Sequence, residues 1–413
     1  LRASSFVPRS RNAEPLGRDF ETKGRMRNSS RVVALAALVL TACESPASDA
    51  AFAVSDSAGI RIVTIETSAI PDTLRVPDEP VWSTEFVDDG GTHYLSNASV
   101  QPADPGRVVV GESGGFVWLG DPVSSQWTSI ARPGDGPAEL GRLSAVRYHD
   151  GSIWAADRAR DRLLEFSLDG NLLSDFQFPV RDLVSADWAP ARDGHLFWGS
   201  GPGWELSDQV VQRPDAPIVL VSSEGIDTLL SRPNVEWFAT EWGSGGPVLR
   251  PYGHLTGSDG VAWIGDSAEA EVFRWSDSTT TIVRWTVAEW DAQTVADSLV
   301  DAALASLPTG QVPPEIEDRI RSIPLSPNPL MFDGLVRRQD GGVVIGPRWA
   351  TMGEEVRRPA GTWLAISPTG EPDYLIALPL GFEPSYFGED HVLGVGRDEL
   401  GREAIQRWEL VGR

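Results

Sequence analysis

Side chains that could catalyse a reaction are few in this sequence, and their spacing forms no clear catalytic site. None of the histidines has a partner at the spacing of a metal site. The five are His93, His149, His195, His254 and His391. Carboxylates are so numerous that no pair stands out as an acid and a base. The sequence therefore predicts no catalytic residue. It favours binding over catalysis and leaves open whether the protein is an enzyme.

Thiol chemistry is possible at one position, because Cys43 is the one cysteine of the chain. It follows a basic segment that starts at Met26 and then nine apolar residues, 32–40. A helix needs about 20 residues to cross a bilayer about 30 Å thick, so this segment is too short. A basic start, a short apolar run and small residues before a cleavage point are typical of a secretory signal.

The four residues Leu40, Thr41, Ala42 and Cys43 resemble the bacterial lipobox. In that motif the cysteine thiol is acylated with diacylglycerol, and the cysteine becomes the first mature residue. The resemblance implies a lipoprotein signal peptide at residues 26–42 and a lipid on Cys43. The alternative is a chance cysteine at the end of an apolar run.

Two flanking segments are interpreted in the same way. Residues 1–25 precede Met26, which can serve as the initiator, and are predicted to be an upstream extension outside the native protein. Residues 43–57 are rich in Ser, Ala and Asp and are predicted to be a flexible linker between the lipid and the folded domain. The predicted location is the cell envelope, with the exported protein lipid-anchored to a membrane in the periplasm or at the outer membrane and cell surface.

Composition limits the partners that the protein can recognise through charge. The chain has 35 Lys and Arg against 59 Asp and Glu, a net charge of −24. This acidity argues against nucleic acid and against an anionic membrane surface, so membrane contact is expected through the lipid anchor only. Hydrophobic residues make up 41% of the chain and include 16 Trp, which is enough for a packed core.

A repeated unit organises the rest of the chain. Six copies begin with an Asp in a turn and continue with a short apolar run. The six are Asp104, Asp150, Asp193, Asp259, Asp340 and Asp390. Successive copies are 46, 43, 66, 81 and 50 residues apart, so a unit of about 45 residues recurs with extra chain in two intervals. Such a period, with several short strands in each unit, predicts a β-propeller.

Each unit has the strands of one four-stranded blade. In the second unit, Asp-Gly pairs at 150–151 and 169–170 provide tight turns between the strands. The four strands are predicted at residues 143–149, 152–156, 163–168 and 171–178. The sixth unit ends at Arg413 without a fourth strand, and residues 59–66 are predicted to supply it and to close the ring. The predicted fold is all-β, a six-bladed β-propeller over residues 58–413.

The interval between the fourth and fifth units has helical periodicity, and residues 288–325 are predicted to be a small helical insertion between blades 4 and 5. Apolar residues recur at helical spacing, and the second helix begins behind Pro313 and Pro314. The apolar positions are Val295, Leu299, Ala303 and Leu307, then Ile316, Ile320 and Ile323. The helices could pack over the blade edges or form a lid over one mouth of the central channel.

Two stretches carry a resemblance to a known family. Residues 156–170, ADRARDRLLEFSLDG, resemble the NHL repeat, and residues 132–140, RPGDGPAEL, resemble a Gly-rich stretch of bacterial six-bladed β-propeller lipoproteins. The second stretch lacks one Gly and the Phe of that family. The resemblance implies a propeller fold and an envelope location but no activity, because many members have none assigned. Asp157 and Arg162 flank a turn and are interpreted as a structural ion pair.

Two functions agree with this sequence. The first is a lipid-anchored propeller without a cofactor that binds an unknown ligand or partner protein at one propeller face. The alternative comes from propellers of the gluconolactonase and paraoxonase type, hydrolases, lactonases or lyases that hold Ca²⁺ in the channel with oxygen ligands. Channel-side candidates for such a metal are Asn97, Asp187, His254 and Glu383, each near an innermost strand. Only one of them is Asn, so the sequence favours the binding function.

Overall fold

A computed structural model describes the chain from residue 51 onward, with gaps. The described residues are 51–88, 92–103, 106–178, 188–191, 194–199, 211–222, 225–240, 243–258, 260–276, 279–287, 291–306, 313–328, 330–347, 362–398 and 400–412. The chain separates into two compact units, Leu1–Ser48 and Asp49–Arg413, and all described residues belong to the second. The predicted signal peptide, lipobox and Cys43 lie outside the described residues. No helix in the described part is long and apolar enough to cross a membrane.

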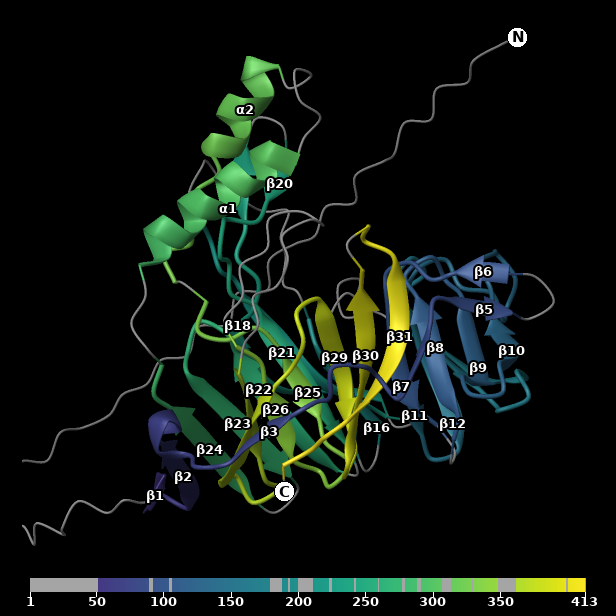
Figure 1. Cartoon of the computed structure of the whole chain (residues 1–413), viewed down its shortest axis with the longest axis horizontal. Coiled ribbons are helices and arrows are strands. Elements are labelled where there is room, and N and C mark those ends of the chain that lie inside the picture. Colours follow the sequence, from purple (N-terminus) through teal and green to yellow (C-terminus); the bar gives the residue numbers. More distant parts are fainter. Residues whose placement is uncertain are drawn as a thin grey trace, which may run out of the picture. The chain divides into compact units, whose positions relative to one another are not determined.

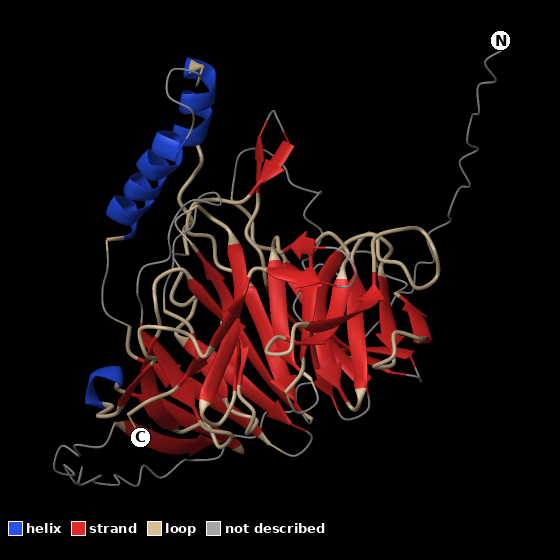
Figure 2. Cartoon of the chain, turned by 45° about the vertical axis from the view of Figure 1, so that its right-hand side comes forward, coloured by secondary structure: helices blue, strands red, loops and turns tan. Residues whose placement is uncertain are grey.

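Six sheets, each with a core of four antiparallel strands, make up the described domain (Figures 1 and 2). Blade 1 contains β7 (Ala98–Pro102), β8 (Val108–Glu112), β9 (Val117–Asp121) and β10 (Gln126–Ala131), and blade 2 contains β11 (Leu143–His149), β12 (Ser152–Asp157), β13 (Arg162–Phe166) and β14 (Leu172–Gln177). Blade 3 contains β15 (Trp188–Ala191), β16 (Gly194–Trp198), β17 (Asp215–Ser222) and β18 (Gly225–Pro233), and blade 4 contains β21 (Gly253–Ser258), β22 (Val261–Asp266), β23 (Glu271–Ser276) and β24 (Thr280–Trp285). Blade 5 contains β25 (Leu335–Arg337), β26 (Val343–Ile345), β27 (Thr362–Ile366) and β28 (Pro372–Ala377), and blade 6 contains β29 (Phe382–Phe387), β30 (His391–Arg397), β31 (Glu403–Glu409) and β4 (Trp82–Thr84).

The Asp-Gly pair predicted to form a tight turn does form one between the first two strands of blade 2. In blade 2, Asp150 and Gly151 have φ angles of 49° and 77°, the left-handed conformation that a two-residue hairpin turn requires. β11 and β12 pair antiparallel on either side of this turn. First strands of neighbouring blades contact one another, as β7 does with β11 and β29, so they lie innermost in the ring. The prediction of a six-bladed all-β fold is confirmed.

Apolar side chains fill the spaces between neighbouring blades. In the described part, six hydrophobic clusters each join two adjacent blades, including the last and the first. At that closing junction Val100 and Trp118 of blade 1 pack with Leu393 and Ile405 of blade 6. Burial of such side chains contributes about 1.5–3 kcal/mol each, so packing between blades holds the ring together.

The N-terminal segment runs along the outer edges of three blades before it enters blade 1. β1 (Phe52–Ser57) and β2 (Ile60–Ile65) form a hairpin, and β2 pairs parallel with β24 of blade 4. After the 3₁₀ turn η1 (Thr67–Ala69), β3 (Thr73–Arg75) pairs parallel with β28 of blade 5. β4 then pairs antiparallel with β31 as the fourth strand of blade 6. We call residues 60–84 the strap.

The strap corrects one prediction. The sequence predicts residues 59–66 as the strand that completes the last blade, and this is wrong. β2 pairs with blade 4, and β4 completes blade 6. The physical reason is that Val63 and Ile65 of β2 are fully buried in the cluster between blades 4 and 5. Trp82 of β4 packs instead against the cluster between blades 6 and 1.

The predicted helical insertion is present between β24 and β25. It consists of α1 (Ala292–Ser306) and α2 (Pro314–Arg321), which are joined by an ion pair of 3.0 Å between Arg321 and Asp301. The apolar side of α1 faces the connection between blades 3 and 4 rather than a blade edge. α2 buries none of its side chains. Packing over the blade edges is therefore not the role of these helices in this structure.

The long described connections between blades leave the ring on one side. In a blade of four antiparallel strands, the first strand begins and the fourth ends on the same side of the ring. Connections there hold the hairpin of β5 (Phe86–Asp88) and β6 (Thr92–Tyr94), the hairpin of β19 (Phe238–Thr240) and β20 (Gly243–Gly245), and the two helices. Figure 1 shows α1, α2 and β20 beyond the ends of the sheets. We call this side the insertion face.

Candidate functional site

A group of buried polar side chains lies on the insertion face where blades 3, 4 and 5 meet. We call it the polar network, and its buried members are Asn234, Glu236, His254, Asp266, Ser267 and Ser326. Asn234 begins the connection from blade 3 to blade 4. Its Nδ2 donates to the carbonyl of Gly199 at 2.6 Å, and its Oδ1 accepts the N–H of Gly253 at 2.6 Å. One amide thus fixes the start of β21 beside the end of β16.

Neighbouring side chains tie this connection to blade 4 and to the segment after α2. The Nε of Arg213 donates to the carbonyl of Asn234 at 2.9 Å, and its guanidinium forms an ion pair with Asp266. The hydroxyl of Ser267 donates to the carbonyl of Tyr252 at 3.0 Å, while its own carbonyl accepts the N–H of Met331 at 2.6 Å. The network is therefore held by several segments far apart in the chain.

His254 and Tyr252 stand at the centre of the network. The Tyr252 hydroxyl donates to the carboxylate of Asp333. The His254 ring lies between Tyr252 and Phe332, with ring centroids 4.6 Å and 5.2 Å away. Only 6% of His254 is exposed, and this burial lowers its pKa to about 3. The imidazole is therefore neutral at physiological pH.

Glu236 and Trp237 offer polar atoms that the described residues leave without a partner. Glu236 has no exposed surface. Its Oε1 accepts a hydrogen bond from Nδ2 of Asn328 at 2.9 Å, but its Oε2 accepts none within the described chain. The Nε1 of Trp237 likewise has no acceptor there. The Arg250 guanidinium lies 5.4 Å from the Trp237 ring, and burial lowers the pKa of Arg250. A buried acceptor and donor without partners are unfavourable, so these atoms suit a polar ligand group.

The inserted helices are attached to the same connection. The N–H of Val248 donates to Pro324 at 2.8 Å, and the N–H of Ser326 donates back to Val248 at 2.9 Å. Ala296 and Leu299 of α1 are buried in a cluster that contains Val248. The connection that carries Glu236 and Trp237 therefore also positions α1.

The four predicted channel ligands come from different parts of the ring. Asn97 is exposed, with φ of 48°, before β7 of blade 1, and Glu383 is half-buried on β29 of blade 6. His254 lies on β21 of blade 4, and Asp187 lies outside the described residues. Within the described ranges, no group of three or more His, Cys, Asp or Glu could hold a metal ion. The channel metal site stays a prediction.

The predicted ion pair of Asp157 and Arg162 is confirmed, at 3.2 Å. Asp157 has no exposed surface and also accepts the N–H groups of Gly141 and Arg142, each at 3.1 Å. Burial alone would raise the pKa of Asp157, but these hydrogen bonds outweigh it, and the pKa lies below its ordinary value. Arg162 also donates to the carbonyl of Glu139 at 2.6 Å. The pair thus anchors the Gly-rich connection from blade 1 to blade 2, a structural role.

A second polar pair on the insertion face joins His93 to Glu112, with 2.8 Å between Nε2 and Oε2. Residues 111–115 read Gly-Glu-Ser-Gly-Gly and match the pattern of a nucleophile elbow, a motif that was missed in the sequence. The elbow of that motif joins a strand to a helix, whereas this turn joins β8 to β9. The turn therefore lacks the strand-to-helix geometry of that motif.

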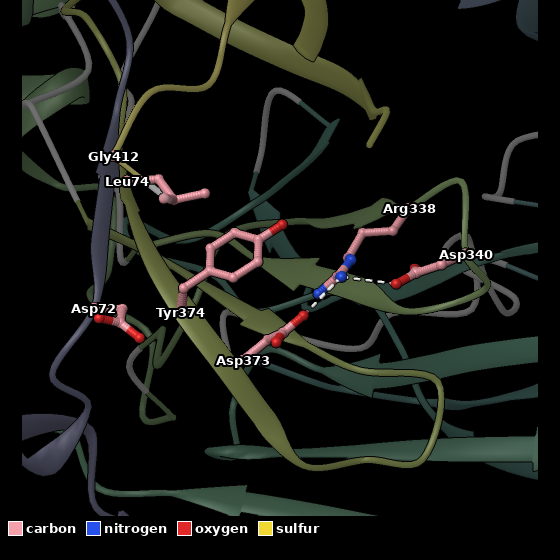
Figure 3. A pocket seen from close by; sticks show the side chains of 7 residues that line it. All are labelled: Asp72, Leu74, Arg338, Asp340, Asp373, Tyr374 and Gly412. Carbon is pink, nitrogen blue, oxygen red and sulfur yellow. Dashed lines mark hydrogen bonds and ion pairs between the residues drawn. The ribbon is translucent and has the colours of Figure 1, made fainter. Parts of the chain in front are cut away.

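A separate cleft of about 540 Å³ lies where the strap and the C-terminal tail pass blade 5 (Figure 3). Its lining residues are Asp72, Leu74, Arg338, Asp340, Asp373, Tyr374 and Gly412. Arg338 donates to Asp340 at 2.7 Å and to Asp373 at 2.8 Å, and Figure 3 shows its guanidinium between the two carboxylates. Asp340 lies in a turn between the first two strands, on the side opposite the insertion face. These ion pairs hold two hairpins of blade 5 together.

Most residues of the polar network were missed in the sequence. His254 alone was singled out, and as a metal ligand rather than as a ring buried between aromatic side chains. Tyr252 and Asp333 are 81 residues apart, and Arg213 and Asp266 are 53 apart, so no local pattern connects them. The one available signal was position, because Asn234, Glu236 and Ser326 lie in connections between predicted blades.

Comparison with known proteins assigns no family. No protein-family model and no curated protein matches the sequence. Among solved structures, a member of the DUF4221 family from Bacteroides vulgatus is 10% identical with a TM-score of 0.47, over 81% of this chain and 98% of its own. Virginiamycin B lyase from Staphylococcus aureus is 11% identical with a TM-score of 0.39, over 80% and 99%.

Regucalcin from Agrobacterium tumefaciens, a calcium-binding protein, is 13% identical with a TM-score of 0.38, over 83% of this chain and 98% of its own. Similarities this distant carry no functional assignment. The order and pairing of its own strands show that the chain is a six-bladed β-propeller with two helices inserted between its fourth and fifth blades.

Proposed function

We propose that this protein is a binding propeller that holds a ligand or partner protein on its insertion face, lipid-anchored at the cell envelope through Cys43. One observation carries the proposal: the two helices, the two added hairpins and the polar network all lie on the same face of the ring. Binding residues concentrate on connections that a rigid scaffold positions, and insertions in repeat folds gather on the binding face.

The chemistry of this face suits a partner with polar and apolar groups. Beneath this face, the buried Glu236 holds an acceptor oxygen and the half-buried Trp237 and Arg250 hold a donor N–H and a cation. α2 adds apolar surface, because its Ile316 is 44% exposed and the helix buries no side chain. An amphipathic polypeptide or a ligand of mixed polarity would satisfy both kinds of surface.

Site-specific photo-crosslinking tests this function. A photoreactive amino acid at Ile316 should crosslink one defined partner in envelope preparations, identified by mass spectrometry. Leu173 on β14, 55% exposed and outside the insertion face, is the matched control position. Equal labelling from both positions would contradict the proposal, because a general sticky surface would then explain the adducts.

A second variant separates binding from folding. Replacing residues 291–323 by a short Gly/Ser link removes both helices, and the ring should still unfold in one cooperative transition because no strand of a blade lies in that segment. The adducts from a photoreactive residue at Trp237 should disappear in this variant if the helices help to hold the partner. Turnover of an ester or lactone that a chelator abolishes would instead favour the channel-metal hydrolase.

A further inference from the structure

Three blades end in an outer strand that no other described strand covers. The strap covers β24, β28 and β31 in blades 4, 5 and 6, whereas β10, β14 and β18 form the outer edges of blades 1, 2 and 3. An uncovered edge offers backbone N–H and C=O groups to another strand. β18 has nine residues, against six in each of β10 and β14. It is therefore the longest of the three open edges.

β18 also exposes apolar side chains, and it has few of the features that protect an edge strand from pairing with another strand. Leu229 and Leu230, at its middle, are 40% and 36% exposed. Its one proline, Pro233, is the last residue of the strand, and it contains no lysine. Elsewhere in this molecule outer strands already accept an extended segment, because β2 and β3 add to the edges of blades 4 and 5. Strand addition is thus compatible with the shape of these blades.

The charges of β18 are complementary to those of a second β18 strand that runs antiparallel to it. With Leu229 skipped, as in the ladder with β17, Asp227 and Arg232 lie two ladder positions on either side of Leu230. When two β18 strands pair antiparallel about a twofold axis at Leu230, Asp227 of each copy therefore lies opposite Arg232 of the other. Opposite charges across an antiparallel pair stabilise it, and like charges destabilise it. β10 has no charged residue and β14 has only Asp175, so neither can form this pattern.

An irregularity in β18 places the two charges on the same side of the sheet. The pairing of β18 with β17 skips one residue between Thr228 and Leu230, which is a β-bulge. Side chains alternate along a strand, so Asp227 and Arg232 would point to opposite sides without the bulge. With it, both residues pair with β17 residues of the cluster facing blade 4, where the Arg232 guanidinium lies 3.9 Å from the Phe273 ring. Opposite charges can therefore meet across the pair.

We propose that two copies of this chain associate through the outer edges of β18, as a twofold-symmetric dimer with antiparallel β18 strands. Blade 3 of each copy then becomes half of one continuous sheet. The contact is isologous: each copy presents the same edge, and two Asp227–Arg232 pairs form. The edge lies on the circumference of the ring, so the insertion face of each copy stays accessible.

Sedimentation velocity of the purified chain over a range of concentrations tests the dimer. The parent should dimerise, and Asp227→Arg or Arg232→Asp alone should lower the association constant about tenfold, because two attractive pairs become repulsive. Asp227→Arg combined with Arg232→Asp exchanges both charges and should restore the association. An equimolar mixture of the two single variants should form the mixed dimer. Ser174→Arg, on the open edge of β14, is the control and should leave association unchanged.

Each outcome decides the proposal. A parent that remains monomeric, or a dimer that both single reversals leave intact, overturns it. Loss of the Arg232 stacking contact could unfold that variant, so thermal melts accompany every measurement. The Asp227→Arg variant and its mixture with the parent then still provide the test. Association of β18 with an unrelated extended peptide but not with a second copy would also overturn the proposal.

Discussion

Two buried histidines should make the protein lose stability as the pH falls. Burial lowers the pKa of His254 to about 3, and burial together with the nearby charge of His149 lowers the pKa of His195 to about 4. Both values lie below the ordinary 6.5, so the unfolded chain takes up these protons first. Stability is therefore complete above about pH 6.5 and falls with pH, until about pH 4 for His195 and about pH 3 for His254.

The expected loss is large for a single domain. One pH unit between the unfolded and folded pKa corresponds to about 1.36 kcal/mol, and pH 5 lies about 1.5 units below the unfolded value. Each histidine should therefore remove about 2 kcal/mol from the free energy of unfolding between pH 7 and pH 5, about 4 kcal/mol together. The structure explains why the rings cannot easily be charged. His195 is 9% exposed and lies 4.2 Å from the ring of Trp154 and 5.1 Å from that of Trp188.

Urea unfolding at pH 7, 6 and 5 measures this effect. Repulsion among the many carboxylates also changes with pH, so the informative quantity is the difference between each variant and the parent at one pH. Relative to the parent at the same pH, the free energy of unfolding of His254→Phe and of His195→Phe should each be about 2 kcal/mol higher at pH 5 than at pH 7. Phe197 is a fully buried neighbour of Trp188 and carries no titratable group, so the free energy of unfolding of Phe197→Leu should differ from that of the parent by the same amount at every pH. Histidine variants that behave like Phe197→Leu would refute the reasoning.

Three further predictions concern other parts of the chain. Arg162→Ala leaves the fully buried carboxylate of Asp157 with fewer donors and should lower the free energy of unfolding by about 3 kcal/mol in urea melts; a loss below about 1 kcal/mol would mean that the backbone donors suffice. Replacing Trp82–Thr84 by glycines removes the fourth strand of blade 6 and should lower Tm more than the same change at residues 55–57 of β1; equal losses would contradict closure by β4. Cys43→Ser should leave uncleaved precursor without lipid, and fatty-acid labelling that persists in the Ser variant would exclude Cys43 as the anchor.

Features encoded within one hairpin could be predicted from the sequence. The Asp150-Gly151 turn, the strands around it and the ion pair of Asp157 and Arg162, five residues apart, all depend on neighbours along the chain. The two helices were recognisable for the same reason. The closing strand was not, because β2 and β4 are both short strands that contain apolar residues. Their partners, β24 and β31, lie hundreds of residues further on, and no local pattern specifies which one each strand will join.

The candidate site was harder to predict for a related physical reason. The properties that mark its side chains, their burial and their hydrogen-bonding partners, arise only when the ring is assembled. Glu236 reads as one of 59 acidic residues in the sequence, whereas in the fold it has no exposed surface and one oxygen without a donor in the described chain. His254 reads as a metal ligand, whereas the fold encloses its ring between Tyr252 and Phe332.

The strap determines when the ring can close during synthesis. The ribosome makes β2, β3 and β4 long before their partners β24, β28 and β31. Contacts between residues so distant in sequence form slowly. Val63 and Ile65, fully buried in the finished ring, stay without their partners until most of the chain has emerged. Release of the last strand, Glu403–Glu409, is therefore the earliest moment at which the first and sixth blades can be sealed together.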